Sequence, residues 1–242
     1  MSKNQLKVFV VGSASYYADF IKDRILVDDI KDADIVLFTG GEDVDPSLYH
    51  AKKLDSTYSN IDRDKEESKI FKKITKKQLA VGICRGSQFL CVQNGGKLMQ
   101  DIRHHAISVT HKIIVSGLSK TDFLLNITST HHQAAYPYDI PFEDYTLIAY
   151  ALFSLNDFPS GSDENIEKTT NGIDFKIVAS LGLPEIVLYH NINSPVCLGI
   201  QGHPEMMPND HNTVVYLNTL INKLVETIKK DYENAKKIKL YE

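Results

Sequence analysis

Short, continuous runs of apolar residues recur along the chain and predict buried strands. They are rich in β-branched and aromatic side chains, and they occupy residues 7–12, 35–38, 79–83 and 196–200. Amphipathic segments follow them, which predicts a short helix at 16–25, a helix at 61–75 and a closing helix at 213–237. Buried strands that alternate with such segments indicate an α/β fold whose parallel sheet is covered on both faces.

Weaker patterns complete the expected order. Further strands are predicted near 97–98, 111–115, 125–130 and 147–152, with 111–115 exposed and antiparallel, and 185–189 is expected to form a hairpin with 196–200. The many charges of the helix at 61–75 are interpreted mainly as a solvated face. Turn residues are dense between 153 and 183, which predicts an inserted excursion. No repeat or linker interrupts residues 1–242, so a single domain is expected.

The third buried run ends in Gly82-Ile83-Cys84-Arg85-Gly86, which predicts a tight turn into a helix over 87–93 with Ser87 as its cap. Glycine on both sides allows such a turn to push Cys84 into a strained, exposed position, as in a nucleophile elbow. The N–H groups and the positive dipole end of the helix would favour the thiolate. The alternative is a buried structural cysteine, which for a lone cysteine is the commoner case.

A base for this thiol, and a group to orient that base, are expected after the strand at 196–200. His203 and Glu205 are two residues apart, so in an extended segment they share a face and Glu205 can hold the imidazole in one tautomer. The expected oxyanion donors are the backbone N–H groups of Arg85 and Gly41, the latter in a Gly-Gly turn after the strand at 35–38. An ordinary Gly-Gly turn is the alternative interpretation of Gly40–Gly41.

Composition narrows the function classes. The 242 residues are 43% hydrophobic and 24% charged with a net charge of −4, which gives no electrostatic footprint for nucleic acid. No apolar run approaches the roughly 20 residues that span a bilayer, and no signal-peptide pattern opens the chain. Three cysteines without paired spacing favour a reducing compartment, so a cytoplasmic protein is expected, with Cys91 and Cys197 in the core. The histidines lack a zinc-ligand spacing, and neither a metal nor a cofactor is expected.

The motifs, taken together and in order, resemble the class I glutamine amidotransferase superfamily and, within it, the γ-glutamyl-γ-aminobutyrate hydrolase group, peptidase family C26. The residues that carry the resemblance are Gly40-Gly41-x-Asp43-Val44-x-Pro46-x-x-Tyr49, Arg63-Asp64-x-x-Glu67, Gly82-Ile83-Cys84-Arg85-Gly86-x-Gln88, Gly95-Gly96-x-Leu98-x-Gln100-Asp101-Ile102, Ser129-x-His131-His132-Gln133 and Gly199-Ile200-Gln201-x-His203-Pro204-Glu205.

This resemblance implies a flavodoxin-like, doubly wound, mostly parallel sheet with Cys84 as nucleophile, His203 as base and Glu205 as its orienter. It also implies a substrate pocket in which Gln88 contacts the glutamyl head group and His131, His132 and Gln133 form part of the lining. One departure is Gly202, since the family's hydrolases usually carry tryptophan before the histidine and this chain has none. The missing side chain is expected to open space beside the thiol.

The function that the sequence predicts is hydrolysis of small γ-glutamyl amides through a thioester on Cys84. The first alternative is a glutaminase component that passes ammonia to a separate synthetase, and the second is a silent binding module on the same fold. A partner synthetase or a homodimer is left open, whereas neither nucleic acid nor a membrane is an expected partner.

Overall fold

A sheet of nine strands forms the centre of the computed structural model, which describes residues 5–102, 106–118, 121–152 and 173–238. Across the sheet the order is β2-β1-β3-β4-β11-β10-β9-β6-β7. The bounds are β1 Leu6–Val11, β2 Arg24–Leu26, β3 Ile35–Phe38, β4 Leu79–Ile83, β6 Ala106–Val115, β7 Phe123–Thr130, β9 Tyr145–Ala151, β10 Leu183–Tyr189 and β11 Val196–Ile200. Strands β5 (Lys97–Met99) and β8 (Ala134–Tyr136) form a second, two-stranded sheet.

Strand direction divides the main sheet into two parts. The five neighbouring strands from β2 to β11 run parallel, and beyond β11 each neighbouring pair is antiparallel, so β10 and β6 run against the rest. β4 lies inside the parallel part, between β3 and β11, and all of its residues are buried. The predicted hairpin of β10 and β11 and the antiparallel direction of 111–115 are both confirmed. The expected exposure of 111–115 is only partly right, because Ile113 and Val115 are fully buried.

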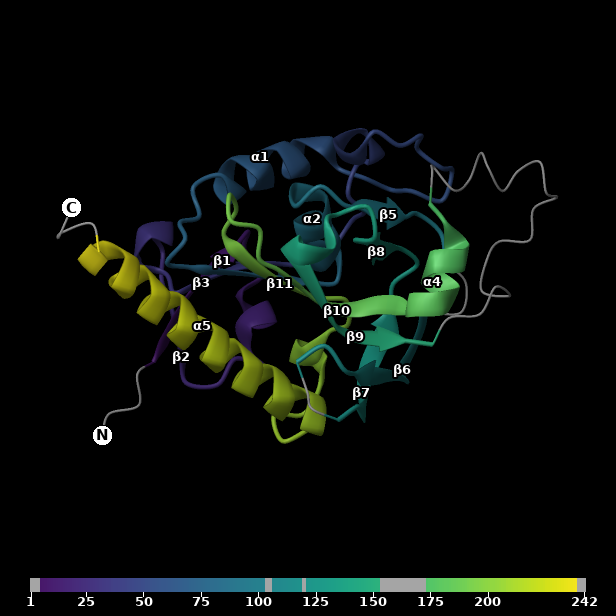
Figure 1. Ribbon diagram of the computed structural model, residues 1–242. Coiled ribbons are helices and arrows are strands. Elements are labelled where there is room, and N and C mark those ends of the chain that lie inside the picture. The colour runs from purple at the N-terminus through teal and green to yellow at the C-terminus, as the bar shows by residue number, and fades with distance from the viewer. Residues whose placement is uncertain (1–4, 103–105, 119–120, 153–172, 239–242) are drawn as a thin grey trace.

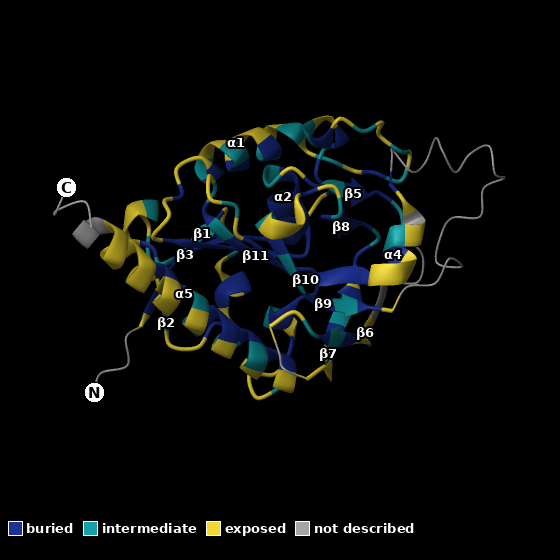
Figure 2. Ribbon diagram, in the orientation of Figure 1, coloured by how far each residue is buried: buried dark blue, intermediate teal, exposed yellow. Residues whose placement is uncertain are grey.

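Helices cover both faces of the main sheet. Figure 1 shows α1 (Ile61–Phe71) and α2 (Arg85–Gln93) on one face and α5 (Asn212–Ile238) across the other, while α4 (Phe175–Leu181) lies near the antiparallel strands. Two apolar clusters correspond to these faces, because Val81 packs in the cluster with Leu217 of α5 and Ala80 packs in the cluster with Phe89 of α2. Figure 2 shows buried strands between helices whose outer sides are exposed. The predicted doubly wound, mostly parallel α/β sheet is confirmed.

Some elements of the structure differ from those predicted from the sequence. The helix expected at 16–25 is wrong: a single 3-10 turn (η1, Ser15–Ala18) is followed by Asp23 with a left-handed φ of 57° and then by β2, which pairs with β1. A left-handed residue cannot continue a right-handed helix, which explains the early end. α1 ends at Phe71 rather than 75. Of the predicted excursion, 153–172 lie outside the described residues, and the single domain stays a prediction.

Candidate active site

Cys84 occupies the turn between β4 and α2. Its φ of 52° and ψ of −109° are rare for a residue with a side chain, which is the strained geometry that the flanking glycines predicted. A Cβ on Gly82 would lie 2.3 Å from the carbonyl oxygen of Gly86, and one on Gly86 would lie 2.3 Å from the carbonyl oxygen of Phe38. The turn therefore excludes any side chain at both positions.

Two details of this turn differ from the prediction. Cys84 itself is the N-cap of α2, whereas Ser87, the expected cap, lies buried inside the helix. The helix starts earlier because the turn is so tight that Arg85 already has helical geometry. The cysteine is also buried rather than exposed, with 9% of its surface accessible. Its N–H donates to the carbonyl of Ile200 at 2.8 Å, which ties the turn to the end of β11.

His203 follows β11 and faces this turn. Its Nδ1 lies 2.7 Å from Oε1 of Glu205, a buried carboxylate, so Nδ1–H donates to that oxygen. Its backbone N–H donates to Oγ1 of Thr128 at 2.6 Å, which holds the segment against β7. Burial alone lowers the pKa of His203, but hydrogen bonds with the Cys84 side chain and with Glu205 raise it to about 10. The imidazolium form is favoured beside the thiol.

A cavity of about 200 Å³ opens beside Cys84. Seven of the nine predicted site residues line it, namely Gly41, Cys84, Arg85, Gln88, His131, His132 and Gln133. His203 and Glu205 do not belong to this lining. The sequence missed four further lining residues, Glu42, Asp43, Tyr58 and Thr130. Asp43 belongs to a quoted motif, but no pattern marks Tyr58 or Thr130.

The polar groups of the cavity are largely held by one another. Nε2 of Gln88 donates to the carbonyl of Gln133 at 2.9 Å and to Oε1 of Gln201 at 3.3 Å. Gln201 in turn points Nε2 at the sulfur of Cys84, 3.8 Å away. The sequence assigned no role to Gln201, although the quoted motif contains it.

The paired histidines differ in charge. Burial lowers the pKa of His131 to about 3, and its Nδ1–H donates to the carbonyl of Gln133 at 2.9 Å, so this imidazole is neutral. Nε2 of His132 lies 3.2 Å from Oδ1 of Asp43, and this hydrogen bond raises the pKa of His132. The cavity therefore offers a neutral imidazole in its wall and a more basic one near the solvent.

Most charges of α1 form a solvated face, as predicted, since Asp62, Lys65, Glu66 and Lys69 are exposed, but two carboxylates are exceptions. Asp64 and Glu67 are buried, and both carboxylates pair with the buried guanidinium of Arg85. The helical charge pattern alone could not show this, because the partner comes from the elbow. Glu67 also accepts from Nε of Arg63 at 2.8 Å.

Tyr17 is another residue near the thiol that the sequence missed. Its ring centroid lies 6.1 Å from that of His203, and a Cβ on Gly40 would meet the Tyr17 hydroxyl at 2.7 Å and Cε1 of His203 at 3.2 Å. Burial, together with Tyr16, Glu205 and Cys84, raises the pKa of Tyr17, so the phenol stays neutral. Only its position after β1 could have drawn attention to it.

The space expected beside Gly202 is occupied. A Cβ at this position would lie 2.3 Å from Cγ1 of Ile127 and 2.9 Å from the carbonyl oxygen of Thr128. Strand β7 thus fills the place where a larger side chain would begin, and the expectation of open space at Gly202 is wrong.

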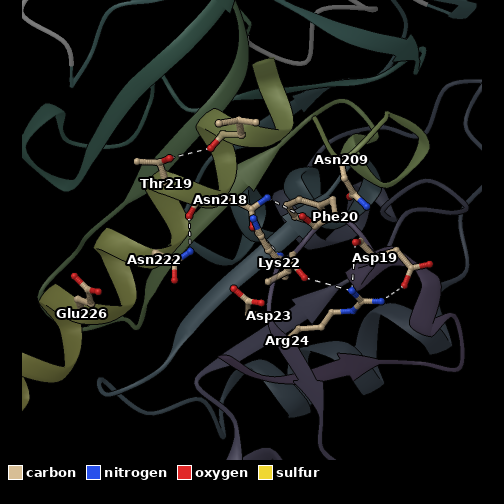
Figure 3. A pocket seen from close by; sticks show the side chains of 12 residues that line it. Asp19, Phe20, Lys22, Asp23, Arg24, Asn209, Asn218, Thr219, Asn222 and Glu226 are labelled. Carbon is tan, nitrogen blue, oxygen red and sulfur yellow. Dashed lines mark hydrogen bonds and ion pairs between the residues drawn. The ribbon is translucent and has the colours of Figure 1, made fainter. Parts of the chain in front are cut away.

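A larger cavity, of about 720 Å³, lies between the segment at 19–24 and α5 and contains none of the predicted site residues (Figure 3). Asn218 of α5 accepts from the N–H of Lys22 at 2.7 Å and donates to the carbonyl of Phe20 at 2.7 Å, and Arg24 pairs with Asp19. These bonds fasten the segment to the helix. The cavity beside Cys84 is therefore the candidate site because of its chemistry rather than its size.

Within the described residues, no three histidine, cysteine, aspartate or glutamate side chains are arranged to hold a metal ion. His104 and His105 lie outside the described residues. Among the helices that the structure describes, none is both long and apolar enough to cross a membrane.

Alkylation should separate the three cysteines. We expect brief treatment with iodoacetamide to label Cys84 at least about 100-fold faster than Cys91 or Cys197, because Cys84 lines the cavity and contacts His203, a base that can take the thiol proton. The other two are fully buried, and burial raises the pKa of each to about 12. Peptide mapping measures the three rates, with protein unfolded in guanidinium as the control in which all three react alike. Equal labelling of the folded protein would contradict the expectation.

The sequence is similar to those of known proteins. The family model described as Peptidase C26 matches residues 21–205. Protein NtpR of Enterococcus hirae is 30% identical over 128 residues, which are 43% of this chain and 52% of that protein. YvdE of Lactococcus lactis subsp. lactis, named as glutamine amidotransferase-like, is 33% identical over 118 residues, which are 41% of this chain and 50% of that protein. The chain thus matches about half the length of these curated relatives.

Solved structures share the fold. A protein from Thermoplasma acidophilum described as one component of a GMP synthase superposes with a TM-score of 0.53 at 17% identity, covering 97% of this chain and 99% of that one. A glutamine amidotransferase from Thermotoga maritima gives a TM-score of 0.51 at 14% identity, covering 98% and 94%. At such identities the likeness concerns the fold alone, which is that of glutamine amidotransferases.

Proposed function

The chain belongs to the Peptidase C26 family, and from this premise we propose that it is a cysteine-dependent hydrolase of γ-glutamyl amides that acts through a γ-glutamyl thioester on Cys84. The observation that carries the proposal is the juxtaposition at the elbow: a strained cysteine, a histidine whose Nδ1 is held by Glu205 at 2.7 Å, and a cavity of about 200 Å³ that the cysteine lines. A nucleophile, its base and an acyl pocket are the parts that acyl transfer needs.

The proposed reaction has two halves. In the first, Sγ of Cys84 attacks the amide carbonyl carbon, the C–N bond breaks, and the imidazolium of His203 gives its proton to the leaving amine. In the second, water attacks the thioester carbon, its proton goes to His203, and the C–S bond breaks to release glutamate and the thiolate. Glu205 holds the imidazole in the tautomer that keeps Nε2 towards the sulfur.

The oxyanion of each tetrahedral intermediate would be held by the backbone N–H groups of Gly41 and Arg85. Both residues line the cavity with Cys84, and Arg85 opens α2, whose first N–H groups have no partners within the helix. The glutamyl group would lie in the cavity, among Gln88, His131, His132 and Gln133. A cavity below the usual 300 Å³ of drug-sized sites suits a short acyl chain.

The test is incubation of the purified protein with glutamine and a panel of γ-glutamyl amines, with mass detection of the released amine and glutamate. We expect at least one amide to be hydrolysed without a second protein, and a glutamyl adduct on Cys84 in rapidly quenched samples. A protein that is inert alone but releases ammonia from glutamine once a synthetase is added would replace the proposal with the amidotransferase function. A protein inert under both conditions would indicate a binding module.

A further inference from the structure

A closed network of ion pairs connects the elbow to α1. Arg85 is buried and pairs with both Asp64 and Glu67, and the second oxygen of Glu67 accepts from Nε of Arg63 at 2.8 Å. Two guanidinium groups and two carboxylates thus offset one another where unpaired charge would be costly. Because Glu67 is bonded to both arginines, it fixes the guanidinium of Arg63 relative to the elbow.

Arg63 uses its remaining N–H groups on the loop after β3. Its Nη2 donates to the carbonyl of Gly40 at 2.9 Å and to the Oγ1 of Thr39 at 3.2 Å, and Nη1 pairs with Glu42 at 2.8 Å. The guanidinium is so close that a Cβ on Gly41, whose φ is +133°, would lie 2.3 Å from Nη1. The backbone conformation of position 41 requires glycine, and the guanidinium of Arg63 occupies the space where a Cβ would lie.

The carbonyl of Gly40 and the N–H of Gly41 belong to the same planar, trans peptide, so they point in opposite directions. Since Arg63 holds the carbonyl, the N–H of Gly41 points away from Arg63. Gly41 lines the cavity with Cys84, whereas Arg63 does not belong to that lining. An arginine that binds one side of this peptide therefore sets the direction of the donor on the other side.

We propose that Arg63 is a positioning residue that aims the Gly41 N–H at the developing oxyanion, and that Glu67 couples this donor to the one at Arg85. The inference rests on the proposed hydrolase function and assigns the charged residues of α1 to that site. Arg63 touches neither the substrate nor the thiol. Its effect is confined to steps in which the carbonyl oxygen gains charge.

Alkylation and hydrolysis together isolate that effect. Iodoacetamide reacts by displacement at carbon, which needs the thiolate but forms no oxyanion. Amide hydrolysis needs the thiolate and also forms an oxyanion that must be stabilised. We expect Arg63→Gln to lower kcat on the hydrolysed amide on the order of 10²-fold, as loss of one oxyanion donor does. KM and the alkylation rate of Cys84 should each stay within about threefold, because the cavity and the thiol are unchanged.

Lys69→Gln is the matched control, since Lys69 lies on the same helix in an exposed pair with Glu66, and both rates should match wild type. Arg63→Lys keeps the charge beside Glu67 but lacks the planar guanidinium whose N–H groups bind Thr39, Gly40 and Glu42 at the same time. It should therefore lower kcat and keep the wild-type melting temperature.

An unchanged kcat in Arg63→Gln, or equal losses of hydrolysis and alkylation in both Arg63 variants, would overturn the inference alone. A wild-type protein inert on every amide would overturn the proposed function and this inference with it.

Discussion

Replacing Cys84 with alanine is expected to lower the hydrolysis of a γ-glutamyl amide by at least about 10³-fold, because no thioester can form. The measurement is kcat on the best substrate of the amide panel. Cys197→Ala is the matched control: it removes a buried thiol of β11 outside the site and should leave kcat close to wild type. Near-normal turnover in Cys84→Ala would exclude the covalent mechanism.

The histidine and the glutamate should follow the cysteine in a defined order. His203→Ala should cost about as much as the loss of the thiol, since the imidazole carries protons in both half-reactions. Glu205→Gln should cost less, because the amide oxygen can still accept from Nδ1 and only the stabilisation of the imidazolium is weakened. A larger loss in Glu205→Gln than in His203→Ala would contradict the roles assigned to them.

The second large effect is on stability. Arg85→Met should lower the free energy of unfolding by about 3–5 kcal/mol, because it leaves the buried carboxylates of Asp64 and Glu67 without their shared partner. Urea denaturation measures the change. Lys65→Met is the control on the same helix: its pair with Asp62 is exposed, and the change should stay within about 0.5 kcal/mol.

A further variant tests the cause of that loss. Combining Arg85→Met with Asp64→Asn removes the buried carboxylate whose ion pair is lost, while Glu67 keeps its pair with Arg63, and should recover part of the stability. No recovery would show that the guanidinium stabilises the elbow by packing, for example through its contact with the ring of Phe89, rather than by offsetting charge.

Local sequence patterns correctly predicted those elements whose structure depends mainly on residues close by in the chain. The runs at 35–38 and 79–83 became β3 and β4, because continuous apolar residues have few alternatives to a buried strand. The glycines at 82 and 86 predicted the strained turn. The structure gives the reason, because the backbone of Phe38 approaches Gly86 so closely that no side chain fits there. The helix predicted at 16–25 did not form, and the segment is instead a turn followed by the edge strand β2. Pairing of β2 with β1 outweighs the weak helical preference of these residues.

The site was predictable only in part. The sequence paired Cys84 with His203 because both follow buried strands and their residue types suit a nucleophile and its base, and the family resemblance implied the same pair. No spacing rule shows that β11 lies beside β4. Arg63 and Glu67 were known only as motif residues, and their charges looked like any exposed helix face. Their burial depends on Arg85, which comes from another element. Tyr58 had no local signal, and Tyr17 had only its position after β1, since both positions follow from the packing of loops.

The place of β11 in the sheet also determines when the reactive centre comes into being during synthesis. Gln201, at the end of β11, lies 117 residues after the thiol that it contacts. A nascent chain that has passed α2 but not β11 holds Cys84 without its base, and β4 has an unpaired edge facing the place of the missing strand. Prematurely terminated chains therefore have Cys84 without its base and without the Ile200 carbonyl that accepts from its N–H, and the open edge of β4 can pair with other chains.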